Sequence, residues 1–118
     1  MRDYKKYTVW QKAHYLCLYV YKEVITFLPG DERFGLVSQM KRAAYSVSLN
    51  IVEGCGRNSD KDFVHFLDMA FGSVNELEYC ALLSYDLAYI NKEQYGIFSR
   101  LINEVKAMLI KLIKSIRK

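Results

Sequence analysis

The chain has 118 residues, of which 52% are hydrophobic and 25% are charged, a composition typical of one globular domain with a single core. A single proline and six glycines leave long stretches without helix breakers, which argues against a fold of many short strands. The net charge of +4 is by itself a weak indication of a polyanionic partner, but both ends of the chain are basic whereas residues 60–78 are acidic.

Residues from about Thr8 to Phe27 are predicted to form the first helix. Apolar residues recur there in steps of three and four, which places Val9, Val24 and Phe27 on one face. A second apolar line lies beside the first and contains Trp10, Cys17, Tyr21 and Ile25. A helix that is apolar on two sides is expected to contact a partner as well as its own bundle.

The second helix is predicted from about Leu36 to Glu53, after a loop that contains the proline and two glycines. Gly54 fits the position just after the helix, where glycine adopts a positive φ without a steric penalty. A polar line beside the apolar face predicts a paired polar seam inside the bundle or between subunits. This line contains Gln39, Arg42, Ser46, Asn50 and Glu53.

The third helix, about residues 60–88, follows Ser59, whose side chain suits an N-cap, and its apolar residues repeat in a heptad-like seam. The small residues Gly72–Ser73 are expected to lie opposite residues 40–42, where they permit the two helices to approach closely. Glu78 projects toward the apolar arc, and a buried carboxylate is seldom tolerated without a partner. Paired carboxylates could instead serve acid–base chemistry, but no second catalytic group accompanies this one.

Asn91 and Gln94 form a predicted capping box at the start of the fourth helix. Beyond it, the large apolar residues fill an arc of about 140° and the basic residues occupy a separate arc. Basic side chains on one helical face attract phosphates; the alternative is an ordinary solvated face, which usually mixes both signs. The candidate phosphate ligands are Lys106, Lys111, Lys114, Arg117 and Lys118 on this helix, assisted by Arg2, Lys5 and Lys6 near the N-terminus.

Four helices with short connections predict an all-α fold, an antiparallel up-down-up-down four-helix bundle, in one domain over residues 1–118. No apolar run approaches the roughly 20 residues needed to cross a bilayer, and no secretory signal is visible. Three cysteines without a CxxC pair argue against a disulfide framework and favour a reducing compartment. We therefore expect a cytoplasmic protein that does not contact membranes.

Catalytic and metal-binding chemistry have little support in the sequence. His14 and His65 are on different helices, and each has one potential second ligand nearby, whereas a metal site needs three or four. The glycine-containing connection Gly54–Ser59 lacks the spacing of a phosphate-binding P-loop and follows a helix instead of a strand. We expect no enzymatic activity, no metal and no cofactor.

Three stretches are characteristic of a known family: VWQKA at residues 9–13, FGLVSQMKRAA at 34–44 and NIVEGCGRNS at 50–59, with further matches up to Tyr79. On these residues the chain resembles the four-helix bundle proteins encoded in intervening sequences of bacterial 23S rRNA genes. Their relatives include the accessory variability proteins of diversity-generating retroelements. One departure is Ser48, where the family usually has a proline, so a proline kink in the second helix is expected to be missing.

The resemblance implies a ring-like homopentamer that binds RNA or DNA through a basic surface, in the retroelement branch together with a reverse transcriptase. A non-catalytic nucleic-acid-binding oligomer is therefore the first functional hypothesis. The alternative is a structural or adaptor oligomer that binds a protein partner, which the second apolar line on the first helix and the ten tyrosines favour.

Overall fold

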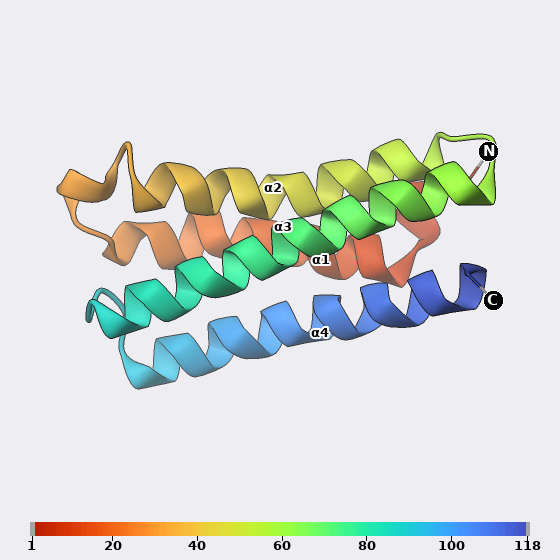
Figure 1. The fold of residues 1–118 in the computed structure, drawn as a ribbon. Coiled ribbons are helices and arrows are strands. Elements are labelled where there is room, and N and C mark those ends of the chain that lie inside the picture. Colours follow the sequence, from red (N-terminus) through yellow and green to blue (C-terminus); the bar gives the residue numbers. More distant parts are fainter. Residues whose placement is uncertain (1, 118) are drawn as a thin grey trace.

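The structure, a computed structural model, describes residues 2–117 and places four long helices side by side, each antiparallel to the one before it (Figure 1). The helices are α1 (Thr8–Tyr19), α2 (Leu36–Cys55), α3 (Asp60–Asp86) and α4 (Lys92–Ile116). Residues 2–117 contain no β-strand, so the all-α four-helix prediction is confirmed. None of the helices in this range is both long enough and apolar enough to cross a lipid bilayer.

The helix that begins with α1 changes its hydrogen-bonding pattern before it ends. A π-helical turn, Val20–Val24, follows α1 directly, and a 3-10 turn, Ile25–Phe27, follows that. From Leu16 to Leu28 the buried residues of this segment are spaced four apart, which is longer than the 3.6-residue period of an α-helix. The π-helical turn is wider than an α-helical turn and therefore keeps these residues on the core side. As a result Leu28 is buried, whereas Phe27, which the sequence pattern placed on the same face as Val9 and Val24, is 52% exposed.

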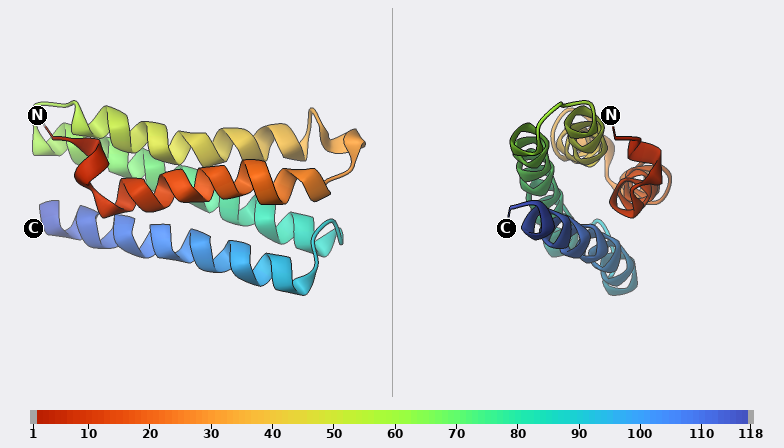
Figure 2. Two further views of the ribbon diagram at one scale, coloured as in Figure 1. Left: turned by 180° about the vertical axis from the view of Figure 1, so that it is seen from behind. Right: turned by 90° about the vertical axis from the view of Figure 1, so that its right-hand side faces the viewer.

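The core fills the space enclosed by the four helices, which follow one another around the bundle when it is viewed end-on (Figure 2, right). Between α2 and α3 the hydroxyl groups of Ser46 and Ser73 lie 2.8 Å apart, and the Asn50 amide donates to the Ser46 carbonyl at 2.9 Å. Ser73 therefore contacts α2 at Ser46, more than one helical turn beyond the predicted contact with residues 40–42. The prediction that Gly72 lies between the two helices was wrong, because this glycine is exposed. The largest fully buried side chains are Phe63, Phe98, Leu16, Met40, Ile51, Leu67, Leu77, Ile102 and Leu109.

Gly54 does not cap α2 as predicted, because it lies inside the helix and no glycine of residues 2–117 has a positive φ. Its lack of a side chain is needed for a different reason. A Cβ atom at this position would lie 3.0 Å from a ring carbon of Phe63 and 3.0 Å from the Cβ of Phe66, both on α3. The glycine thus allows the end of α2 to pack directly on the start of α3.

The starts of α3 and α4 follow the expected local chemistry. The Ser59 hydroxyl accepts a hydrogen bond from the Asp62 amide at 3.1 Å, and Asn91 with Gln94 forms the predicted capping box. Tyr89, in the α3–α4 connection, donates its hydroxyl proton to the Glu32 carboxylate at 2.9 Å. This hydrogen bond raises the pKa of the Tyr89 phenol and ties together the two connections at that end of the bundle.

Candidate nucleic-acid interface

The N-terminal segment and the end of α4 lie at the same end of the bundle (Figures 1 and 2), and both segments are rich in basic residues. The N-terminal segment and α1 begin there, α2 ends there, and the start of α3 lies beside the end of α4. We call this region the basic end; it contains Arg2, Lys5, Lys6, Arg57, Lys61, Lys111, Lys114 and Arg117. The two basic termini noted in the sequence thus form one region, and the predicted ligand Lys118 lies outside the described residues.

Arg2 fixes the N-terminal segment to the start of α3. Its guanidinium donates to the Asp60 carboxylate at 2.6 Å and to the Arg57 carbonyl at 2.9 Å, and it lies 4.2 Å from the ring centroid of Phe63. A guanidinium held by a carboxylate and an aromatic face is already well satisfied. Arg2 is therefore better suited to anchoring this segment than to binding a phosphate.

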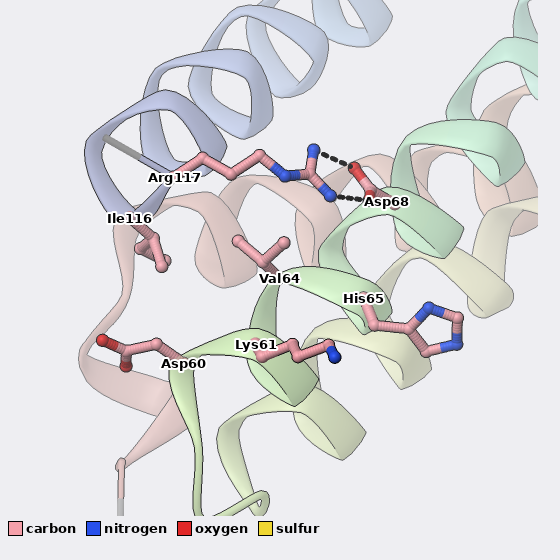
Figure 3. Close-up of a pocket in the computed structure, with 7 residues that line it drawn as sticks. All are labelled: Asp60, Lys61, Val64, His65, Asp68, Ile116 and Arg117. Atoms are coloured by element: carbon pink, nitrogen blue, oxygen red, sulfur yellow. Dashed lines mark hydrogen bonds and ion pairs between the residues drawn. The ribbon is translucent and has the colours of Figure 1, made fainter.

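Two of the predicted phosphate ligands on α4 pair instead with acids on α3. The Lys106 ammonium lies 3.1 and 3.3 Å from the two carboxylate oxygens of Glu78. Both terminal nitrogens of Arg117 donate hydrogen bonds to the Asp68 carboxylate (Figure 3). These hydrogen bonds raise the pKa of the Arg117 guanidinium. Glu78 is paired as predicted, but its side chain is 46% exposed and therefore not the buried carboxylate that the sequence pattern indicated. These two pairs join α3 to α4.

The remaining lysines of the basic end are exposed and unpaired. Within residues 2–117, no carboxylate lies within 4.0 Å of the ammonium groups of Lys5, Lys6, Lys61, Lys111 or Lys114. The structure therefore divides the candidate ligands of the sequence into a paired set (Arg2, Lys106 and Arg117) and a free set (Lys5, Lys6, Lys111 and Lys114), and it adds Lys61 to the free set.

Local structure fixes the backbone from which the free lysines project. Lys5 and Lys6 lie in a 3-10 turn, Tyr4–Lys6, in which the Asp3 carboxylate accepts from the Lys5 amide at 3.1 Å. The Gln11 side chain donates to the Lys5 carbonyl at 2.8 Å, which fixes this turn to α1. Lys111 and Lys114 are three residues apart on the last two turns of α4, so their side chains project from neighbouring positions on its surface.

A cleft of about 430 Å³ lies between the first turns of α3 and the last turn of α4 (Figure 3). Asp60 and Asp68 line it together with Lys61, and Arg117 reaches across it from α4 to Asp68, while the His65 imidazole points away from the Arg117–Asp68 pair. Two carboxylates in the lining oppose the binding of an anion in this cleft. The free lysines outside it are the better phosphate ligands.

A second groove of about 430 Å³ lies on the other side of α4, between its last turns and the start of α1. Its walls are mainly apolar, and the free Lys111 stands on its rim. The residues that line this α1–α4 groove are Tyr7, Thr8, Val9, Met108, Lys111, Leu112 and Ser115.

The acidic side chains and the thiols of the described residues do not form a joint site. Glu53 pairs with Arg57 at 3.2 Å near the end of α2, far along the chain from the Glu78–Lys106 pair. The described residues include no group of three or more His, Cys, Asp or Glu side chains arranged to hold a metal ion. Burial raises the pKa of the Cys80 thiol to about 11, which keeps it protonated and unreactive at neutral pH.

Sequence reasoning did not foresee that α3 would neutralise part of the basic face of α4. The signal was present, because the acidic stretch 60–78 and the basic stretch 100–118 belong to successive helices, and successive helices of such a bundle lie antiparallel in contact. The register of α3 against α4 decides which basic side chain pairs with a carboxylate, and the pattern of charges in the sequence does not specify that register.

Comparison with known proteins identifies a family. A family model described as 23S rRNA-intervening sequence protein matches residues 5–111. Among solved structures, a protein of unknown function from the S23 ribosomal protein family of Bacteroides thetaiotaomicron is 29% identical, with a TM-score of 0.83 over 91% of this chain and 99% of that chain. No curated protein matches the sequence.

Proposed function

Since the chain belongs to the family of 23S rRNA-intervening sequence proteins, we propose that it binds RNA or DNA through the basic end and catalyses no reaction. The observation that supports this proposal is the convergence of free lysines from the N-terminal segment, α3 and α4 on one end of the bundle. Unpaired ammonium groups attract a polyanion, because binding it releases condensed counterions from its phosphates.

Binding by lysines alone does not read sequence, because contacts to phosphates carry no base information directly. If Lys5, Lys6, Lys61, Lys111 and Lys114 each neutralise one phosphate, the logarithm of the association constant with duplex DNA should fall with the logarithm of salt concentration at a slope of about −4 to −5. The proposal places the protein in the cytoplasm, where reduced thiols and nucleic acids occur together.

Replacing Lys111 and Lys114 together with glutamine should weaken binding of a 20-base-pair duplex at least tenfold at low salt and make the salt slope shallower by about 2. The matched control is the double replacement of Lys22 and Lys92, which are exposed, unpaired in the described residues and located at the opposite end of the bundle. Fluorescence anisotropy over a series of salt concentrations measures both quantities. Equal losses in the two double variants would show that only net charge matters, and undetectable binding by the wild type at low salt would refute the proposal.

We also propose that the protein assembles with copies of itself, as the family resemblance implies in the form of a ring-like pentamer. Large apolar side chains that are 38–57% exposed support an interface on the outer faces of α1, of the π-helical turn that follows it, and of α2. They are Tyr15, Leu18, Tyr21, Tyr45 and Leu49. A ring would repeat the basic end and convert several weak phosphate contacts into tighter overall binding.

The same exposed side chains favour the second candidate function, an adaptor that binds a reverse transcriptase or another protein. Light scattering of the purified chain distinguishes self-association through this surface from its use in binding a different protein. Self-association predicts a mass that is a multiple of the 13.8 kDa protomer, five times that value for the pentamer. A monomer at micromolar concentration would contradict self-association and leave these faces available to a different protein.

A further inference from the structure

The α1–α4 groove has features that the binding of a duplex does not use. Val9 is 5% exposed at its floor, and Met108 and Leu112 are half-buried, so the groove presents apolar surface next to water. It lies in the basic end, with the free Lys111 on its rim; Lys114, three residues further along α4, lies outside the groove lining, on the side of α4 that faces α3. An apolar recess bordered by unpaired positive charge suits a ligand that carries a flat apolar group and a phosphate together.

From these features we infer that the α1–α4 groove binds an unpaired base of single-stranded nucleic acid while Lys111 and Lys114 bind the adjoining phosphates. This inference rests on the proposed function. A base within a duplex is stacked and paired, so it does not reach such a groove, whereas the bases of a single strand are free to turn outward. Tyr7 also lines the groove, and the part of its ring that does not contact Phe63 offers an aromatic surface against which a base can pack.

The size of the groove favours a base over a peptide helix. Its volume of about 430 Å³ is within the usual range of small-molecule pockets. Two turns of an α-helix with its side chains occupy roughly 850–1,200 Å³, given a diameter of about 10–12 Å, so a partner helix would remain largely outside. The charge on the rim is also complementary to a phosphate backbone.

Polar groups at the start of α1 add to this complementarity. No side chain caps α1, and among residues 2–117 the backbone N–H groups of Thr8 and Val9 have no hydrogen-bond acceptor. The Ser115 hydroxyl donates to the Leu112 carbonyl at 2.7 Å, so its oxygen remains available as an acceptor. These groups can hydrogen-bond the edge of a base or a phosphate oxygen, but the apolar recess and the free lysines carry the inference.

The experiment compares three probes of equal phosphate number: a single-stranded oligonucleotide, the same strand with its bases removed, and a duplex. Electrostatics alone favours the duplex, because single strands release fewer counterions per phosphate. The wild-type protein should bind the normal strand about tenfold more tightly than the abasic strand, since stacking of one base on an aromatic surface contributes a factor of this size. Equal affinity for the two strands would overturn the inference.

Ser115→Leu tests whether the groove is the base site, because it adds an aliphatic side chain at the exposed edge of the groove and removes no charge. It should abolish the tenfold preference for the normal strand and leave binding of the abasic strand unchanged. The matched control is Asn103→Leu, which adds the same side chain at an exposed position near the middle of α4. A preference that survives Ser115→Leu would place the base elsewhere; if all three probes fail to bind the wild type at low salt, the proposed function itself is wrong.

Discussion

Replacing Phe63 with alanine should lower the free energy of unfolding by about 3–5 kcal/mol, the usual cost of removing a buried aromatic ring. Phe63 is 2% exposed and lies at the first turn of α3, where its ring meets that of Tyr7 edge-on at 5.9 Å and supports the Arg2 guanidinium at 4.2 Å. Its loss therefore opens a cavity and also releases the contact that docks the N-terminal segment. Chemical denaturation at a fixed protein concentration, followed by circular dichroism, measures the change.

Phe34→Ala is the matched control, because it removes the same ring from a position that is 88% exposed. The ring of Phe34 lies beside the Arg33 guanidinium at 5.2 Å and is not part of the core. We expect a change within about 0.5 kcal/mol, as for most surface substitutions. Similar losses in the two variants would mean that Phe63 does not pack as the structure shows.

Local features of the fold could be predicted from the sequence because they depend on residues three or four positions apart. The Ser59 cap and the Asn91–Gln94 capping box each join groups within one turn, so the residue types and their spacing specify them. The periodicity of apolar residues likewise predicted the start of every long helix within one residue.

Features that depend on contacts between helices could not be predicted from residue spacing in this way. The π-helical turn Val20–Val24 arises because buried positions four residues apart must stay on the core side, and Phe27 matches a three–four pattern equally well in the sequence. Ser48, where the family usually has a proline, lies within an uninterrupted α2, as expected, but its hydroxyl is buried and has no hydrogen-bond partner in residues 2–117. Nothing in the linear pattern indicated that burial.

The candidate interface shows the same division between local and long-range information. A basic stripe on the fourth helix was predicted from spacing alone, and Lys111 and Lys114 are exposed as that prediction requires. The pairing of Lys106 with Glu78 and of Arg117 with Asp68 depends on how α4 lies along α3. The number of free positive charges at the basic end, and hence the expected salt dependence, follows from the three-dimensional structure.

Gly54→Ala should destabilise the protein by about 1 kcal/mol, although alanine is the better helix former. Inserting a methyl group into a packed core costs about 1–3 kcal/mol, and here the new Cβ would lie 3.0 Å from the Phe66 Cβ and 3.2 Å from the Phe63 carbonyl oxygen. Both of these atoms are close to the α3 backbone, so relief requires α2 and α3 to move apart. The gain in helix propensity of about 1 kcal/mol offsets part of this cost. Thermal and chemical denaturation of the variant measure the net effect.

Gly72→Ala is the matched control and should change stability in the opposite direction. Gly72 also lies inside a helix, but a Cβ atom there would meet no atom within 4 Å, so the steric cost is absent and the gain in helix propensity of about 1 kcal/mol remains. The same substitution thus separates a glycine required by close packing from one that is not. If Gly54→Ala were neutral or stabilising, α2 and α3 would be further apart at this end than the structure places them; if Gly72→Ala were destabilising, the exposed face of α3 would be covered, as it would be by a second copy of the chain.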